Sequence, residues 1–246
     1  MDDLFSIEQK NVVIVGGNGG IGSALVEGFV NRSANVLAMD LRNESIHRDA
    51  VFKHVDLKDP DSIASCVDET LSEYGAPTVL INCAGVTTPM HDDHSWFADW
   101  RATMSVNLDA VFSISHRFSR RMVADQVKGS IINVTSIGGH QGFPANPAYV
   151  ASKGAVRLLS KAMAVDLGEF GIRVNNLVPG YTRTPMNEAS WNDEAKRLKR
   201  ASSTILARWA EPKDFVGPAV FLASDASCYV TGTDLIVDGG WLAKGL

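Results

Sequence analysis

Cysteine is scarce in this sequence, and its placement fits neither a disulfide framework nor a metal site. Among 246 residues there are three, Cys66, Cys83 and Cys228, an odd number without close pairs. Chains that work in the reducing cytosol typically carry such unpaired thiols. We therefore expect three reduced, buried cysteines in a cytoplasmic protein.

The sequence also lacks an excess of basic residues and any long apolar run, and we expect no signal peptide at its start. The 23 lysines and arginines are outnumbered by 28 acidic residues, which gives a formal net charge of -5. Nucleic-acid and polybasic membrane surfaces need clustered Lys and Arg, so neither partner is expected. The run Val12–Val15 is far too short to cross a bilayer, and residues 1–6 lack the basic and apolar regions of a signal peptide.

Two histidines, His91 and His94, lie close together, but no third ligand follows at a spacing useful for a metal ion. We interpret the pair as part of a solvated loop. The sequence therefore predicts no metal site.

Apolar residues are abundant, and their spacing predicts the fold class. They make up 45% of the chain, which is ample for a packed core at this length. Short runs rich in Val and Ile alternate with longer helical segments, which is typical of an α/β domain with helices on both faces of a parallel sheet. The segments predicted as strands are Asn11–Gly16, Asn35–Asp40, Val51–Val55, Thr78–Asn82, Ser130–Ser136, Arg173–Val178 and Asp234–Val237.

No repeat or linker divides the chain, so we predict a single domain over residues 1–246, a Rossmann-type doubly wound parallel sheet of about seven strands. Right-handed crossovers bring the loops that follow the strands to one edge of such a sheet. Residues 184–205 interrupt the alternation beyond the carboxyl end of a strand. We expect this segment to act as a substrate lid.

The first strand runs into the glycine-rich segment Gly16–Gly22, and an amphipathic helix follows. A pyrophosphate needs close approach of the backbone and free N–H groups at a helix N-terminus, and glycine allows both. Two glycine spacings overlap here, G-x-G-x-x-G from Gly17 and G-x-x-x-G-x-G from Gly16. A glycine cluster alone could be a tight turn, but its position after the first strand favours a dinucleotide site.

An acidic residue, Asp40, ends the second predicted strand, 18 residues after Gly22. A carboxylate there can accept hydrogen bonds from the adenosine ribose hydroxyls, and it would repel the 2′-phosphate of NADP. We therefore expect NAD as the cofactor and NADP less readily. Arg42 lies close enough to soften this preference, and a turn or capping role for Asp40 stays open.

Polar and small residues follow the next two strands. Asp56 and Leu57 come after the third strand and could meet the adenine. The segment Asn82–Gly85 follows the fourth strand, where small residues would let the backbone pass close to a cofactor. Each segment, taken alone, could equally be an ordinary turn.

Tyr149 and Lys153 are four residues apart at the start of a strong helical pattern. Positions i and i+4 share a helix face, so the phenol and the ammonium can reach the same cleft. A nearby cation lowers the pKa of a tyrosine from its ordinary value of about 10. Tyr149 could then exchange a proton with a substrate hydroxyl near neutral pH. The alternative is a pair on the protein surface.

Two further polar residues occupy positions that chemistry could use. Ser136 ends the fifth predicted strand, where its hydroxyl could polarise a substrate oxygen, although serine is also a common turn former. Asn107 lies among apolar residues in a long helical stretch, where a buried amide that only satisfies its own hydrogen bonds is the alternative.

In chain order these motifs resemble those of the short-chain dehydrogenase/reductase family, over almost the whole chain. The matching residues are Gly16-x3-Gly20-x-Gly22, Asp40, Asp56-Leu57, Asn82-x-Ala84-Gly85, Asn107, Ser136, Tyr149-x3-Lys153, Pro179-Gly180 with Thr184, and Val237-Asp238-Gly239-Gly240. The sequence departs from the family's usual residues at Val15, Cys83 and Thr182.

The resemblance implies a catalytic tetrad. Tyr149 would be the general acid and base, Ser136 would orient the substrate oxygen, and Lys153 would bind the nicotinamide ribose and lower the Tyr149 pKa. Asn107 would hold a water that links Lys153 to solvent. The residues implied to contact the cofactor are Gly16, Asn18, Gly20, Ile21, Gly22, Asp40, Leu41, Asp56, Leu57, Asn82, Ala84, Gly85, Tyr149, Lys153, Pro179, Gly180, Thr182 and Thr184.

The family resemblance also implies a homotetramer. Its members mostly pack two long helices, here near Trp96–Asp125 and Pro147–Phe170, and the C-terminal strand across two-fold axes. The apolar C-terminal residues Trp241, Leu242 and Leu246 are consistent with such an interface. A tail packed within its own subunit is the alternative.

Within the family, the segments Ala207–Pro212, Gly217–Ser224 and Val237–Lys244 look like those of sugar-acid dehydrogenases such as gluconate 5-dehydrogenases. This implies a small-molecule substrate, a secondary alcohol or ketone that is a sugar acid or polyol. The expected lid carries a basic cluster that could attract a carboxylate, or be merely a solvated helix face. The cluster consists of Lys196, Arg197, Lys199 and Arg200.

Two other functions were weighed against this one. A 3-oxoacyl-carrier-protein reductase would share the tetrad, but such enzymes usually take NADP, which Asp40 disfavours. A non-catalytic dinucleotide-binding regulator would have no need of an intact Tyr149 and Lys153 pair.

Overall fold

Seven parallel strands form one sheet in the order β3-β2-β1-β4-β5-β6-β7. The computed structural model describes residues 4–42, 47–88 and 96–244, so His91, His94 and Leu246 lie outside the described residues. The strands are β1 (Asn11–Val15), β2 (Asn35–Asp40), β3 (Val51–His54), β4 (Val79–Asn82), β5 (Gly129–Val134), β6 (Ile172–Pro179) and β7 (Asp234–Val237). The predicted fold class and all seven strands are confirmed, although β5 ends two residues before Ser136.

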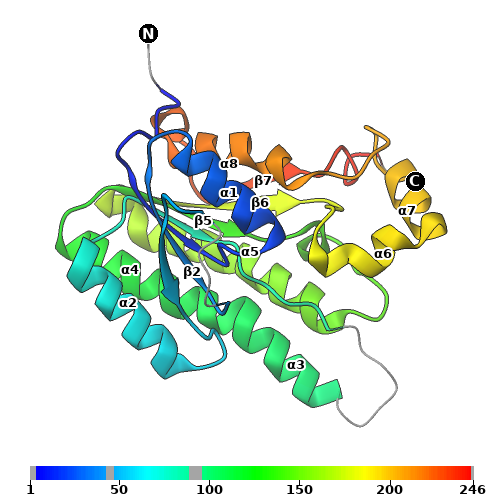
Figure 1. The fold of residues 1–246 in the computed structure, drawn as a ribbon, viewed down its shortest axis with the longest axis horizontal. Coiled ribbons are helices and arrows are strands. Elements are labelled where there is room, and N and C mark those ends of the chain that lie inside the picture. Colours follow the sequence, from blue (N-terminus) through cyan, green and yellow to red (C-terminus); the bar gives the residue numbers. More distant parts are fainter. Residues whose placement is uncertain (1–3, 43–46, 89–95, 245–246) are drawn as a thin grey trace.

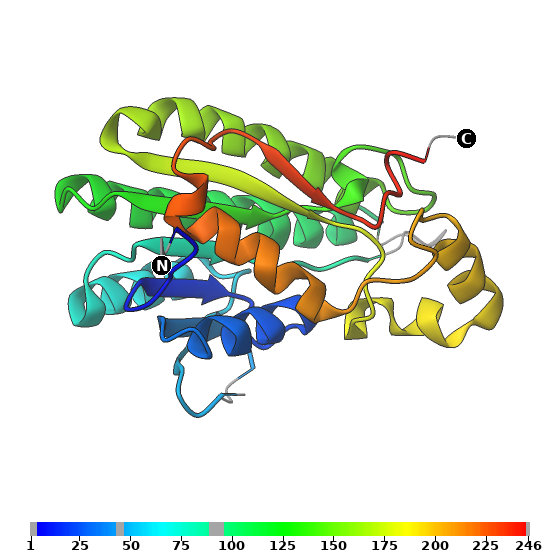
Figure 2. The same ribbon diagram turned by 90° about the horizontal axis from the view of Figure 1, so that it is seen from above.

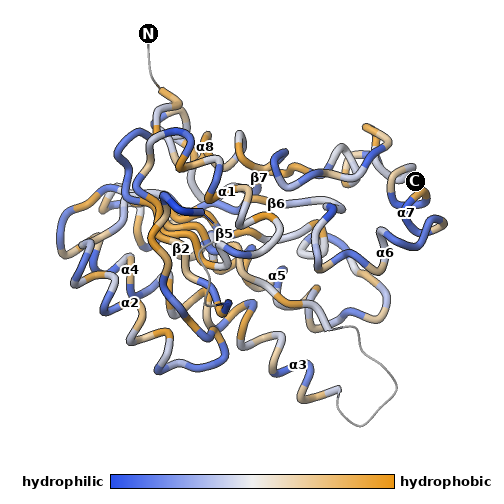
Figure 3. The backbone as a smooth tube through the Cα atoms, in the orientation of Figure 1, coloured by the Kyte–Doolittle hydropathy of each residue, from blue (hydrophilic) through white to orange (hydrophobic). Residues whose placement is uncertain are grey.

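The central strands are buried on both faces, which explains their continuous apolar sequences. All four residues of β4 are buried, and so are the last four of β1. Figure 3 shows these strands as the most hydrophobic part of the tube. Strands with helices on both faces read as unbroken Val and Ile runs rather than as alternating ones.

Two helical layers cover the sheet (Figure 1). The apolar core on one face contains residues of α1 (Gly20–Val30) and α8 (Val216–Ala223). The core on the other face contains residues of α2 (Pro60–Tyr74), α4 (Ala110–Ala124) and α5 (Pro147–Leu167). The remaining helical segments are α3 (Trp96–Met104), η1 (Ser105–Asp109), η2 (Ile137–Gly139), η3 (Gly168–Phe170), η4 (Pro185–Asn187), α6 (Glu188–Asn192), α7 (Glu194–Ser202), η5 (Pro212–Phe215) and η6 (Asp225–Ser227).

The sheet reverses its winding between β1 and β4, because β1 pairs with β2 on one side and with β4 on the other. In open parallel sheets a ligand crevice forms at such a reversal, beyond the carboxyl ends of the strands. Figure 2 shows α6 and α7 beyond the same ends of the strands.

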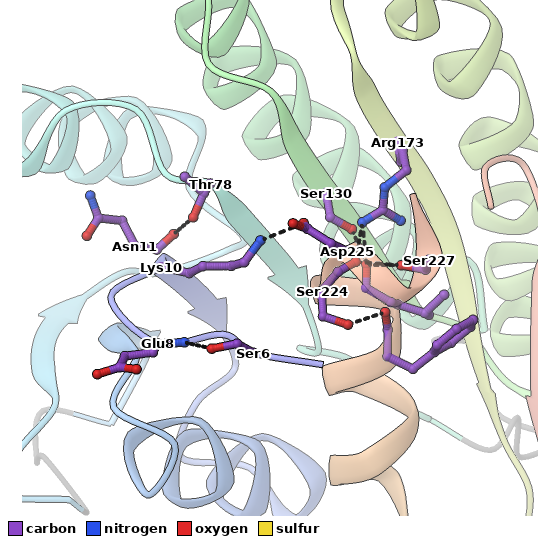
Figure 4. Close-up of polar contacts among 12 residues, drawn as sticks. Ser6, Glu8, Lys10, Asn11, Thr78, Ser130, Arg173, Ser224, Asp225 and Ser227 are labelled. Carbon is purple, nitrogen blue, oxygen red and sulfur yellow. Dashed lines mark hydrogen bonds and ion pairs between the residues drawn. The ribbon is translucent and has the colours of Figure 1, made fainter. Parts of the chain in front are cut away.

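Polar contacts close the opposite, amino edge of the sheet (Figure 4). Lys10 pairs with Asp225 at 3.3 Å, and the Ser130 hydroxyl and the Arg173 guanidinium both donate to the carbonyl of Leu222 at 2.8 Å. These contacts tie the starts of β1, β5 and β6 to the end of α8. The carboxyl edge is therefore the one left for a ligand.

A row of polar side chains crosses the four strands β4 to β7. Asn82, Asn133, Asn176 and Asp234 are successive partners in the register of β4 to β7. Asn82 donates to Asn133 at 2.7 Å, and Asn176 donates to Asp234 at 2.8 Å. Ser160 of α5 joins the two halves, since it accepts from Asn133 and donates to Asn176. The row thus supplies its buried side chains with hydrogen-bond partners that apolar neighbours could not provide.

Two expectations about individual residues change. Cys66 is buried and Cys83 partly so, but Cys228 is exposed, so the prediction of three buried cysteines is wrong at that position. The Trp241 ring contacts Phe143 and Tyr181 of its own chain, which favours a tail packed within the subunit at that position. None of the described helices is long and apolar enough to span a membrane.

Candidate active site

A cavity of about 840 Å³ opens at the carboxyl edge of the sheet, over the reversal between β1 and β4. Its size lies within the range of small-molecule and cofactor sites. The predicted site residues that line it are Gly16, Gly20, Ile21, Gly22, Asp40, Leu41, Asp56, Leu57, Ala84, Gly85, Ser136, Tyr149, Lys153, Pro179, Gly180, Thr182 and Thr184. The structure thus brings together residues that are up to 168 positions apart in the sequence.

The glycine-rich turn fits a pyrophosphate group. Gly16 has φ of +81°, and a Cβ there would lie 2.6 Å from the backbone nitrogen of Ala84. Gly19 caps the N-terminus of α1 without any side-chain hydrogen bond, so no side chain competes for the first backbone N–H groups. A Cβ on Gly20 would lie 2.6 Å from Thr184 Cγ2, which puts that threonine against the helix N-terminus. Free N–H groups and the helix dipole favour an anion here.

Asp40 holds the loop where an adenosine would lie. Its carboxylate accepts from the backbone N–H of Asn18 at 2.9 Å and from that of Arg42 at 3.1 Å. The Arg42 side chain lies 3.9 Å from the same carboxylate and also donates to the Asn18 carbonyl. A cation and an anion therefore share this end of the cavity.

Tyr149 enters the cavity from the first turn of α5. Pro147 occupies the first position of this helix, where its missing N–H costs nothing. Ser136 follows β5 and caps η2 by accepting from the Gly138 N–H at 3.0 Å. Burial raises the pKa of the Tyr149 hydroxyl, and its hydrogen bond with Ser136 acts in the opposite direction. In the chain by itself, burial outweighs the effect of Ser136, so the pKa of Tyr149 is raised and the lowering expected from Lys153 is not seen.

Lys153 is buried beneath Tyr149. Its ammonium donates to the carbonyl of Val134, the last residue of β5, at 2.9 Å. The same nitrogen lies 5.9 Å from the centroid of the Tyr149 ring. Burial lowers the pKa of Lys153 from 10.5 to about 8. A Cβ on Gly85 would lie 3.4 Å from the ammonium, so the small residue leaves space beside it.

Asn107 lies in η1, a turn of π-helix between α3 and α4. Its amide accepts from the Val86 N–H at 2.8 Å, and donates to the Val86 carbonyl and to Ser152. Its oxygen is 3.5 Å from the position of a Cβ on Gly85, the position that also neighbours Lys153. The π-helical turn therefore points this amide at the loop after β4, beside the lysine.

Three predicted residues, Asn18, Asn82 and Asn107, do not line the cavity. The Asn18 side chain donates to the carbonyl of Arg42, and Asn82 donates to Ser115 and to Asn133 in the polar row. Each is a buried residue that supports a lining segment instead of facing the cavity.

The aromatic wall of the cavity was not predicted from the sequence. Phe143 and Tyr181 line it, with ring centroids 6.1 Å apart. Tyr181 directly follows the Pro179-Gly180 motif, which could have indicated it. Phe143 lies in the loop after η2 and has no comparable signal. Of the basic cluster, only Arg200 lines the cavity.

Comparison with known proteins agrees with this geometry. Residues 15–242 match a family profile described as Enoyl-(Acyl carrier protein) reductase. The chain is 35% identical to 5-keto-D-gluconate 5-reductase of Escherichia coli K12, over 98% of this chain and 99% of that protein. The chain belongs to the short-chain dehydrogenase/reductase family. It is an oxidoreductase that uses a nicotinamide dinucleotide.

Solved structures give the same assignment. A gluconate 5-dehydrogenase from Burkholderia cenocepacia in complex with NADP and tartrate superposes with a TM-score of 0.93, at 33% identity and with 99% of each chain covered. A 4-hydroxyisoleucine dehydrogenase complexed with NADH superposes with a TM-score of 0.90, at 32% identity, over 96% of this chain and 100% of that one. Similar proteins thus bind either form of the cofactor.

The lowered pKa of Lys153 gives the stability of the chain a specific dependence on pH. Between about pH 8 and 10.5 the unfolded chain keeps a proton on this lysine that the folded chain has released. Stability rises with pH wherever the unfolded state binds more protons. We expect the free energy of unfolding of the wild type, relative to Lys153→Met, to rise across this window in urea denaturation without added cofactor. A difference that stays flat or falls would contradict the burial of the ammonium.

Proposed function

We propose that the protein interconverts a secondary alcohol and a ketone, with a sugar acid or polyol as the substrate. The observation that carries the proposal is that Ser136, Tyr149 and Lys153 lie together on the wall of the cavity, with the Lys153 ammonium 5.9 Å from the centroid of the Tyr149 ring. The bound nicotinamide dinucleotide accepts or supplies a hydride. Every other step falls to side chains of this chain.

In the oxidation, the Tyr149 oxygen takes the proton of the substrate hydroxyl as the carbon gives up its hydride. The Ser136 hydroxyl holds the same substrate oxygen. The Lys153 ammonium would favour the phenolate and bind the nicotinamide ribose, while Asn107 supports the loop after β4 beside this lysine. In the reduction, Tyr149 returns the proton to the oxygen of the ketone.

Replacing Tyr149 by phenylalanine tests this assignment. We expect Tyr149→Phe to lower kcat by about 10²- to 10⁴-fold, the usual contribution of general acid–base catalysis. Binding of NADH, measured by fluorescence titration, should be nearly unchanged. The same substitution at the exposed Tyr74 is the control and should leave both quantities intact. Substantial turnover by Tyr149→Phe would refute the role.

We propose NAD as the preferred cofactor, because the Asp40 carboxylate lies at the adenosine end of the cavity and would repel a 2′-phosphate. Arg42 is the opposing influence, since its guanidinium lies 3.9 Å from that carboxylate. The relatives with bound NADP show that the family accommodates either cofactor, so the balance between these two side chains decides the preference here.

Two substitutions separate the two side chains. Asp40→Ala should raise kcat/KM with NADP relative to NAD by about tenfold or more, because a like-charge contact is removed. Arg42→Ala should lower kcat/KM with NADP relative to that with NAD. Steady-state kinetics with both cofactors measure this ratio for each variant. A wild-type enzyme that already prefers NADP would overturn the argument from Asp40.

The sugar-acid assignment rests on the relatives and on the cavity. Two of the three relatives named above carry the names of a keto-gluconate reductase and a gluconate dehydrogenase, and the second was solved with tartrate, a hydroxy acid. In this chain Met186, Asn187 and Arg200 of the expected lid line the cavity. We propose that residues 184–205 close over the substrate there. The 3-oxoacyl-carrier-protein reductase alternative has less support: the family profile carries the name of an acyl-carrier-protein reductase, but none of the three full-length relatives does.

We also propose a cytoplasmic homotetramer. Leu158 and Val165 of α5 are 64% and 81% exposed and seven residues apart on one helix face, and Phe112 of α4 is 49% exposed. Apolar patches of this kind mark protein interfaces. The cytoplasm suits a chain whose described cysteines are all unpaired.

Sedimentation equilibrium tests the assembly. We expect a particle of four chains for the wild type and dissociation for Val165→Asp, because a buried unpaired charge disfavours an apolar interface. Leu198→Asp, at an exposed leucine of α7, should stay tetrameric. A monomeric wild type would refute the proposal.

A further inference from the structure

One cation of α7, Arg200, is held against aromatic rings on the wall of the cavity. Its guanidinium carbon lies 4.6 Å from the centroid of the Tyr181 ring and 5.6 Å from that of Trp209. Both distances are those of cation–π contacts, in which the flat face of the guanidinium meets the ring. Stacking of this kind leaves the N–H groups at the edge of the guanidinium able to donate in its plane.

Hydrogen bonds hold the Trp209 ring and the backbone of Tyr181 in position. Trp209 is 5% exposed, and its indole N–H donates to the carbonyl of Arg197 at 3.0 Å, which ties it to α7 itself. The carbonyl of Tyr181 accepts from the N–H of Ala210 at 2.9 Å. The segments that carry the Tyr181 and Trp209 rings are therefore joined to α7, which carries Arg200. The guanidinium is held in place against the two rings before a ligand binds.

The other cations of this segment are already engaged or face away from the cavity. Lys196 pairs with Asp193 at 2.9 Å, and Arg197 donates to the Trp191 carbonyl at 3.0 Å. Lys199 is exposed and does not line the cavity. The side chain of Arg200 makes no ion pair and no hydrogen bond with the residues that the structure describes. Its N–H groups are therefore free to bind a ligand.

The wall that carries Arg200 continues to the reacting tyrosine. The rings of Tyr181 and Phe143 are 6.1 Å apart. Phe143 and Tyr149 meet over Gly138, where a Cβ would lie 3.1 Å from the first ring and 3.3 Å from the second. Away from the Asp40 end, the charged residues among the described lining are Lys153 and Arg200, both cationic. A negatively charged substrate suits this end of the cavity.

We propose that Arg200 binds the carboxylate of the substrate, and that this contact makes the enzyme favour sugar acids over the corresponding polyols. A guanidinium can hold a carboxylate by two parallel N–H···O bonds, which fixes both the position and the orientation of the acid. The inference rests on the proposed function, the oxidation of a sugar acid or polyol at Tyr149.

The test compares D-gluconate with D-glucitol, in which a hydroxymethyl group replaces the carboxylate. For Arg200→Gln we expect kcat/KM for gluconate to fall by about 10- to 100-fold, mostly through KM, because a charge-assisted hydrogen bond to the substrate is lost. The value for glucitol should stay within about twofold, since no charge is bound there. Arg200→Lys keeps the charge without the two-pronged geometry and should recover part of the loss.

Lys199→Gln is the matched control, because it removes the same charge from the neighbouring exposed position. It should leave kcat/KM unchanged for both substrates. The thermal midpoint and the KM for the cofactor show whether each variant is intact. The inference would be overturned if both Arg200 variants lost kcat/KM equally for gluconate and glucitol, or if neither lost kcat/KM for gluconate. Either result would leave the proposed function standing. A wild-type enzyme that oxidises neither compound, nor reduces 5-keto-gluconate, would overturn the proposed function and with it the inference.

Discussion

The hydrogen bond from the Lys153 ammonium to the Val134 carbonyl is the contact on which the active site depends. It joins α5 to the last residue of β5, and so fixes the helix that carries Tyr149 against the strand that leads to Ser136. The glycine at position 139 allows this approach, because a Cβ there would lie 2.9 Å from the Lys153 carbonyl. The contact thus joins the two segments that carry the site, α5 with the phenol and the ammonium, and the end of β5 that leads to the serine hydroxyl.

The cavity divides into two regions with different physical character. At one end, the backbone N–H groups of α1 and the pair of Asp40 and Arg42 suit phosphates and a ribose. At the other end, Phe143 and Tyr181 supply an apolar wall with a cation set into it. Backbone N–H groups and one ion pair thus line one end of the cavity, and aromatic rings with a single cation line the other.

This division explains how much the sequence could predict. The strands and the glycine turn follow from local spacing, and so does the helical pairing of Tyr149 with Lys153, which the structure preserves. The inward role of Asn82 could not be foreseen, because it depends on the register with β5. The stacking of Arg200 depends on rings that the tertiary fold brings together. The raised pKa of Tyr149 likewise depends on burial, which spacing does not reveal.

The polar row across β4 to β7 also helps to set the register of these strands. In each of these strands the amide or carboxylate points toward the α4 and α5 layer, while its neighbour in the sequence points into the opposite, apolar core, as Ile132 does beside Asn133. A slip of one residue would reverse every side chain of a strand. It would put an unsatisfied amide among apolar residues, at a cost of about 1–3 kcal/mol for each group. The native register is therefore favoured because a register shifted by one residue would leave these polar side chains buried without partners.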